Sequence, residues 1–165
     1  MILLINICKE KLHFYEFVKP VEDILSKNKI EFSTRHYKDL TNQNPTKADK
    51  FIICGTSLKD NDFLENIEKF SWIKNCKKPV LGICGGSHVI GLIFGGKIRR
   101  KKEIGLKEIN IEKEFLGVKG KKQVYHLNQF RVLPEVWKHK TKPIYATLFH
   151  PEVRNKEIIE DFCRI

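Results

Sequence analysis

The chain has 165 residues, enough for one domain with its own hydrophobic core. Hydrophobic residues make up 41% and charged residues 31%, a globular composition whose apolar runs are too short to span a bilayer. The net charge of +11 comes from lysines spread along the chain, so the basic run Lys97–Lys102 favours a solvated hairpin over a nucleic-acid contact. We therefore expect neither a membrane nor nucleic acid as a partner.

The cysteines and the first residues indicate where the protein works. No CxxC pair is present, so we expect no zinc site or other metal site, and we interpret the thiols as free in a reducing compartment. The apolar start Met1–Cys8 has no basic leader and no small-residue cleavage site, which favours a first strand over a signal peptide. The expected location is the cytoplasm. The five cysteines are Cys8, Cys54, Cys76, Cys84 and Cys163.

The first half of the chain alternates short apolar runs with helical patterns. Strands are predicted at Ile2–Ile7, Ile30–Tyr37, Phe51–Cys54 and Val80–Ile83. Helices are predicted at Phe14–Leu25, with a start or kink near Pro20, at Asp62–Phe70 and at Ser87–Phe94, and a loop at Thr41–Lys47. Fully apolar strands that alternate with helices indicate a parallel sheet covered on both faces.

The second half is more polar and predicts antiparallel hairpins. Between Lys97 and Val132 the segments are short, with turns expected at Gly105, Gly117 and Gly120. A last strand is predicted at Pro143–Phe149, followed by a helix at Lys156–Ile165 with Asn155 as its N-cap. Because the sequence contains no linker that would divide two domains, we predict one α/β domain over residues 1–165. Its fold class is a three-layer sandwich with a mostly parallel central sheet, flanking helices and added hairpins.

The segment Val80–Ile90 carries the strongest chemical signal. A buried strand ends in Gly-x-Cys-x-Gly and an apolar helix comes next, which predicts a sharp strand-to-helix turn that exposes Cys84. At a helix N-terminus, backbone N–H groups and the helix dipole stabilise a thiolate. The segment therefore predicts a cysteine nucleophile of the acyl-transfer kind.

A second segment offers the groups that a thiol nucleophile needs. His150 and Glu152 follow a predicted strand and are separated by one proline. Because ligands bind at the carboxyl ends of the strands in α/β sheets, Cys84 and His150 are expected to meet there. His150 would then be the base and Glu152 its orienting group.

Together these segments resemble the class I, triad-type glutamine amidotransferases, nearest to free-standing glutaminase subunits of GMP-synthase type. The resemblance is carried by residues 79–86 and 149–153, by Phe-Gly-Gly-Lys at 94–97 and by Ile53-Cys54-Gly55. It implies the family's flavodoxin-like fold and its Cys-His-Glu triad. It also implies an oxyanion hole formed by Gly55, Thr56 and Gly85.

The resemblance further implies the reaction and the partners. Glutamine would be hydrolysed through a γ-glutamyl thioester, with no cofactor, and the ammonia would pass to a separate synthase subunit in purine biosynthesis. The chain has no P-loop of its own. His88 stands where the family usually has a substrate-binding Gln, and His126 lies in a loose match to the family's substrate strand.

Alternatives remain open at this point. His88 in place of Gln slightly favours a stand-alone hydrolase of γ-glutamyl or peptide bonds, and a non-enzymatic regulatory relative is the third reading. Buried packing is the competing interpretation for Cys84, and packing or a backbone partner for His88, His126 and His150.

Overall fold

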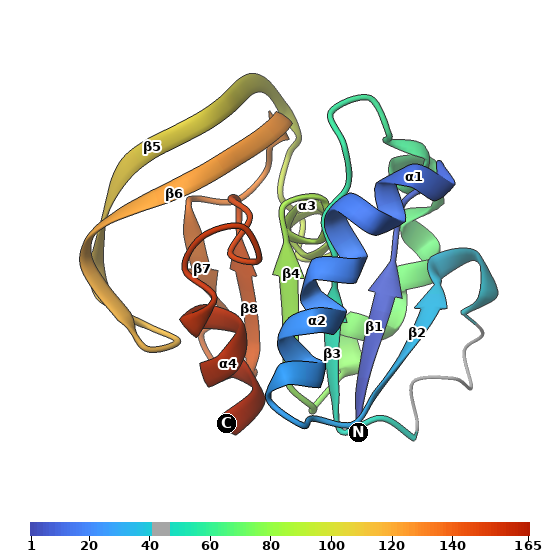
Figure 1. The fold of residues 1–165 in the computed structure, drawn as a ribbon. Coiled ribbons are helices and arrows are strands. Elements are labelled where there is room, and N and C mark those ends of the chain that lie inside the picture. Colours follow the sequence, from blue (N-terminus) through green and yellow to red (C-terminus); the bar gives the residue numbers. More distant parts are fainter. Residues whose placement is uncertain (41–46) are drawn as a thin grey trace.

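The computed structural model describes residues 1–40 and 47–165 and contains a six-stranded sheet with helices on both faces (Figure 1). The strand order is β2-β1-β3-β4-β8-β7, and every neighbouring pair is parallel except β7 with β8. The strands are β1 (Ile2–Asn6), β2 (Phe32–His36), β3 (Lys50–Ile53), β4 (Val80–Ile83), β7 (Val136–Lys138) and β8 (Ile144–Thr147). The predicted three-layer α/β class is confirmed, although β7 was not expected.

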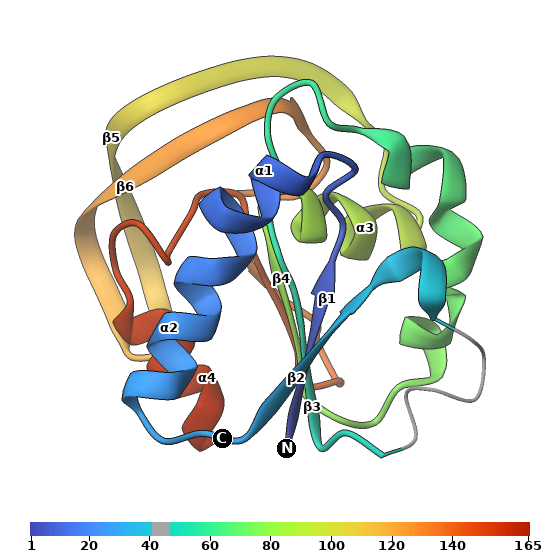
Figure 2. The ribbon, with the colours of Figure 1, turned by 45° about the vertical axis from the view of Figure 1, so that its right-hand side comes forward.

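The helices form two layers, and each layer has its own core. Figure 2 shows α2 (Lys19–Lys27) and α4 (Glu157–Arg164) on one face of the sheet, with η4 (Asp62–Asn75) and α3 (Gly85–Ile93) on the other. Successive side chains of β1 point to opposite faces. Leu4 therefore packs with the α2 and α4 side, whereas Leu3 and Ile5 pack with the η4 and α3 side.

The helical segments differ from the expected ones in detail. In place of one helix at Phe14–Leu25 there are a short α1 (Lys11–His13), a π-helical turn η1 (Phe14–Val18) and then α2. Pro20 lies in the first turn of α2, where its missing N–H is not needed. The segment η4 is a 3-10 helix rather than an α-helix and is interrupted by non-helical Asn66. A further 3-10 turn, η2 (Tyr37–Asp39), comes after β2.

Residues 99–131 form one long curved hairpin, not several short ones. Strands β5 (Arg99–Phe115) and β6 (Val118–Arg131) pair antiparallel, and the turn lies at Leu116-Gly117. Gly117 is at the turn as expected, but Gly105 and Gly120 lie inside the strands with φ of 96° and 77°. Glycine inside a strand is typical of a bend, and the hairpin does curve around the body of the molecule (Figure 1).

Two further expectations concern segment ends. The N-cap of α4 is Lys156, and Asn155 lies one residue earlier with a φ of 74°, so the predicted cap was wrong by one position. Of the predicted loop Thr41–Lys47, all but Lys47 lie outside the described residues. Among the helices of the described part of the chain, none is long and apolar enough to cross a membrane.

Candidate active site

Cys84 occupies the sharp turn between β4 and α3, in a backbone conformation that a non-glycine residue rarely adopts. Its φ is 48° and its ψ is −101°. Its N–H donates to the Thr147 carbonyl over 2.8 Å, and its own carbonyl accepts from the N–H groups of Ser87 and His88 at 2.9 and 3.2 Å. Strained backbone of this kind persists where surrounding contacts hold it, and it concentrates at functional sites.

Two glycines let the helix begin this close to the sheet. A Cβ atom on Gly86 would lie 2.3 Å from the Ile53 carbonyl oxygen, and one on Gly82 would lie 2.5 Å from the Gly86 carbonyl oxygen. Both contacts are with backbone, so neither could be relieved by turning a side chain. The Gly-x-Cys-x-Gly pattern is therefore required by the packing of the turn and not only by its dihedral angles.

His150 and Glu152 form a buried pair beyond the end of β8. The Nδ1 atom of His150 lies 2.7 Å from Oε1 of Glu152, and neither side chain is exposed. A carboxylate only accepts hydrogen bonds, so Nδ1 carries the proton and donates it to Glu152. The other ring nitrogen, Nε2, is buried without a hydrogen-bond partner among the residues that the structure describes.

Gly55, just after β3, lies against both the imidazole and Cys84. A Cβ atom at this position would be 2.7 Å from Cε1 of His150 and 3.5 Å from Cβ of Cys84. Burial lowers the pKa of His150, but interactions with Cys84 and Glu152 raise it, and the net pKa lies well above its usual value. A raised imidazole pKa beside a thiol favours an imidazolium–thiolate pair.

The sulfur of Cys84 faces β6 of the long hairpin. Its Sγ lies 3.5 Å from the Leu127 carbonyl oxygen. A cavity of only about 10 Å³ adjoins it, lined on one side by the segment after β3 and on the other by residues 127–130 of β6. Room for about one water molecule is left beside the thiol.

The expected oxyanion residue Gly85 and the expected substrate residue His88 both lie on α3, next to Cys84. Gly85 is the first residue of α3, so its N–H has no acceptor within the helix, and a Cβ on it would lie 3.4 Å from Cγ2 of Thr56. His88 lines the cavity, and its Nε2 lies 2.9 Å from the Phe130 carbonyl oxygen. Burial lowers the pKa of His88 to about 4, which makes this ring a neutral donor at neutral pH.

His126 lies behind the cavity wall, not in it. Its Nδ1 is 3.0 Å from Oδ1 of Asn128, and its Nε2 is 3.2 Å from Oε2 of Glu135. The residues of β6 that line the cavity are its successors, Leu127 to Phe130. The loose match to the family's substrate strand included Leu127 and Asn128, but the sequence did not indicate the contacts of Leu127 and Phe130, because these use backbone carbonyls, which every residue type has.

Two other cysteines near the site have less reactive thiols. Burial raises the pKa of Cys54 well above its usual value and that of Cys8 to about 12. A buried thiol of raised pKa is a poor nucleophile. Neither cysteine adopts the left-handed backbone of Cys84.

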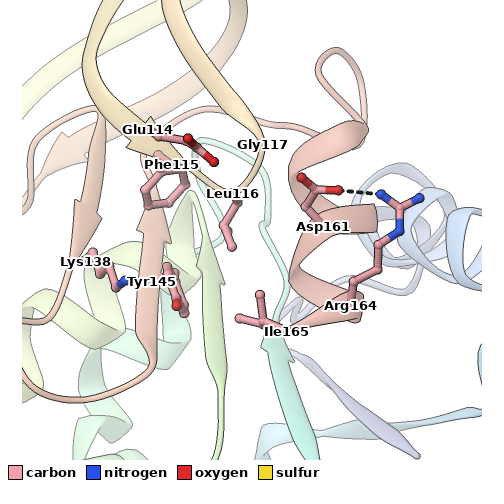
Figure 3. A pocket seen from close by; sticks show the side chains of 9 residues that line it. All are labelled: Glu114, Phe115, Leu116, Gly117, Lys138, Tyr145, Asp161, Arg164 and Ile165. Carbon is pink, nitrogen blue, oxygen red and sulfur yellow. Dashed lines mark hydrogen bonds and ion pairs between the residues drawn. The ribbon is translucent and has the colours of Figure 1, made fainter.

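The larger hollows of the molecule lie elsewhere. One of about 380 Å³ separates the hairpin tip from α4 and contains the Asp161–Arg164 ion pair and the ring of Tyr145 (Figure 3). None of Cys84, His150 and Glu152 lines it. The candidate site is therefore identified by its chemistry rather than by its size.

Comparison with known proteins identifies the family of this chain. Residues 12–138 match the family model of glutamine amidotransferase class-I. This chain belongs to the class I glutamine amidotransferases. The A subunit of the glutamine-hydrolyzing GMP synthase of Pyrococcus abyssi is 33% identical over 162 residues, which cover 83% of this chain and 82% of that protein. The protein of the same name from Methanosarcina barkeri is 27% identical over 172 residues, covering 89% and 87%.

Solved structures share the fold. A Thermoplasma acidophilum protein assigned as the A subunit of a GMP synthase superposes with a TM-score of 0.84 at 20% identity, covering 99% of this chain and 92% of that one. A glutamine amidotransferase from Thermotoga maritima superposes with a TM-score of 0.64 at 16% identity, covering 98% and 82%. The expected flavodoxin-like amidotransferase fold is thereby confirmed.

Proposed function

We propose that this chain is the glutaminase subunit of a GMP-synthase-type amidotransferase, which releases ammonia from glutamine for a separate synthase subunit. The observation that supports the proposal is that Gly55 lies against both the ring of His150, which is paired with Glu152, and Cβ of Cys84 at the strained turn before α3. The names of the Pyrococcus and Methanosarcina relatives support the GMP-synthase type.

In the first half-reaction His150 takes the thiol proton on Nε2, and the Cys84 thiolate attacks the side-chain amide carbon of glutamine. Glu152 holds the proton on Nδ1 and stabilises the imidazolium that forms. The N–H groups of Gly85 and of the Gly55-Thr56 turn stabilise the oxyanion. The imidazolium then protonates the amide nitrogen, the C–N bond breaks and ammonia leaves.

In the second half-reaction water replaces ammonia. His150 takes a proton from the water as it attacks the γ-glutamyl thioester carbonyl, the C–S bond breaks, and glutamate leaves while Cys84 regains its proton. Because the cavity beside the thiol holds only about 10 Å³, glutamine requires that the lining of this cavity, formed by the segment after β3 and residues 127–130 of β6, move away from Cys84. His88, whose ring is neutral, would then contact the substrate from α3.

A stand-alone γ-glutamyl or peptide hydrolase is the second candidate, because His88 replaces the Gln that the family usually uses to hold glutamine. A non-enzymatic relative is the third candidate. Either would keep the fold and lose the proposed reaction.

Ammonia release separates these functions. Wild type, Cys84→Ala and the control Cys54→Ala are incubated with glutamine and, separately, with a γ-glutamyl dipeptide. The proposal expects ammonia from glutamine in wild type and Cys54→Ala but not in Cys84→Ala. Turnover of the dipeptide alone would support the second candidate. No turnover, together with slow alkylation of Cys84, would support the third.

A further inference from the structure

A cluster of side chains beside the candidate site has no place in the mechanism above. It consists of Asp60, at the end of the loop after β3, and His13, on α1. The Asp60 residue is 4% exposed, and its Oδ2 lies 2.9 Å from Nδ1 of His13. The same Oδ2 accepts the N–H of Lys9 over 2.7 Å and that of Glu10 over 3.4 Å. One carboxylate oxygen thus joins the loop to the segment between β1 and α1.

The cluster is not a second nucleophilic site. Ser57 Oγ lies 3.3 Å from Nδ1 of His13, on the nitrogen that also faces Asp60. In a Ser-His-Asp triad the serine and the aspartate use opposite ring nitrogens. Because a carboxylate only accepts, Nδ1 of His13 donates to Asp60 and cannot take a proton from Ser57.

The cluster is also a poor device for stability alone. Oδ1 of Asp60 is buried and makes no hydrogen bond within the described ranges 1–40 and 47–165. A half-satisfied buried carboxylate costs free energy that an apolar side chain would not. Its contribution is better sought in what it holds in place.

The loop that Asp60 ends is the one that begins at Gly55. Gly55 lies against the His150 ring and Cβ of Cys84, and the next residue, Thr56, lies against Gly85. A second contact from the same segment reaches the start of the loop, since Cys8 Sγ lies 3.6 Å from the Gly55 carbonyl oxygen. The loop is therefore tied at both ends to the chain between β1 and α1.

We propose that Asp60 and His13 are positioning residues that hold the Gly55-Thr56 turn in register with Cys84 and His150. This inference rests on the proposed function, in which that turn donates to the oxyanion. Asp60 acts through the backbone of its loop and touches neither substrate nor nucleophile. Loss of the clamp would let the turn drift, and drift of about 1 Å costs on the order of 10² in rate.

Substitutions at both partners test the clamp. Asp60→Ala and His13→Ala should each lower kcat for ammonia release by about 10²-fold, comparable to the loss of one oxyanion donor, while KM changes little. His13→Asn keeps an N–H donor near the position of Nδ1 and should restore most of the rate. Glu112→Gln removes an exposed carboxylate of β5 and is the matched control.

Two readouts separate positioning from a general loss of structure. Alkylation of Cys84 by iodoacetamide builds no oxyanion, so its rate should stay near wild type in all four variants. Amide hydrogen exchange over residues 53–61 should rise in the two alanine variants and return toward wild type in His13→Asn.

The outcomes are distinct. Wild-type kcat in Asp60→Ala, or unchanged exchange over residues 53–61, would overturn the clamp. So would an equal fall in turnover and in alkylation, since that would indicate general unfolding. If wild type releases no ammonia from glutamine, the proposed function fails, and exchange still decides whether Asp60 holds the loop.

Discussion

Two neighbouring strands of the sheet end in the same tripeptide, Ile-Cys-Gly, with very different results. Residues 53–55 close β3 and residues 83–85 close β4, and the strands pair in parallel with Ile53 opposite Gly82. Burial raises the pKa of the Cys54 thiol well above its usual value, and its N–H simply continues the pairing with β1 through the Ile5 carbonyl. Cys84 instead turns to a φ of 48° at the N-terminus of a helix.

The difference lies in the residues that come after the tripeptide. After Gly55 comes an irregular loop that ends at Asp60, whereas Gly85 begins α3 and Gly86 lets that helix start against the Ile53 carbonyl. A helix start adds a dipole and a series of free N–H groups that stabilise a thiolate, which the irregular loop after Gly55 does not provide for Cys54. The Ile-Cys-Gly tripeptide at the end of β4 thus supplies the candidate nucleophile, whereas the copy at the end of β3 lies beside that nucleophile.

Replacing each of the two cysteines by alanine should give the largest difference in glutamine turnover. Cys84→Ala should lower glutamine turnover by about 10⁴-fold or more, as loss of a nucleophile does. Cys54→Ala should keep the rate within a few-fold of wild type, because its thiol has no step to perform. Steady-state ammonia release measures both, and circular dichroism checks the fold. Comparable losses in the two variants would remove the distinction between the strand ends.

Glu152 tests whether the imidazole beside Cys84 must be oriented. Glu152→Gln keeps the shape but lets the Gln amide offer its N–H groups to Nδ1, which favours the wrong tautomer of His150. Turnover should fall by about 10³-fold, less than for loss of the nucleophile. The effect is measured by comparing kcat/KM as a function of pH in wild type and Glu152→Gln. A change below about threefold would show that His150 needs no orienting group.

Gly55 is the point where the two strand ends meet. Its φ is not in the left-handed region, so Gly55→Ala acts through its new methyl group, which must displace the His150 ring from 2.7 Å. We expect turnover to fall by about 10²-fold with a small change in Tm. Gly120→Ala is the converse control, because its φ of 77° is strained by a side chain that meets no neighbour. That variant should lose stability and keep its rate.

His88 on α3 should make the stability of the protein depend on pH. Burial lowers its pKa to about 4 from 6.5, so between those pH values the unfolded chain binds a proton that the folded chain does not. Stability should therefore fall as the pH drops from about 6.5 to about 4, by at most ~3 kcal/mol from this group. His88→Gln should weaken that acid dependence in urea unfolding. An identical dependence in both proteins would place the lost stability on another group.

The parts of the fold that could be predicted are those encoded by neighbouring residues. Apolar runs indicated the five strands that pair in parallel, and the glycines around Cys84 indicated the turn, because both depend on local sterics and burial. His150 and Glu152 were singled out for a similar reason, since they follow a strand that ends at the same edge of the sheet, and their pairing at 2.7 Å is what the structure adds.

The parts that could not be predicted depend on long-range contacts. Gly105 and Gly120 looked like turns, but the antiparallel pairing of β5 with β6 makes them bends inside one hairpin. His126 looked like a substrate contact, but the pleat turns its ring toward Asn128 and Glu135 and leaves the cavity wall to its successors. The residues of the Asp60–His13 contact are 47 positions apart in the sequence, and no local sequence pattern predicts the contact.

Trapping the acyl-enzyme tests the central claim most directly. Protein mixed with glutamine is quenched in acid within the first turnover, digested and analysed by mass spectrometry. The account predicts one γ-glutamyl group on the peptide that contains Cys84, none on the peptide that contains Cys54, and none anywhere in Cys84→Ala. A γ-glutamyl group on any other residue, or ammonia release by an enzyme that never carries one on Cys84, would contradict it.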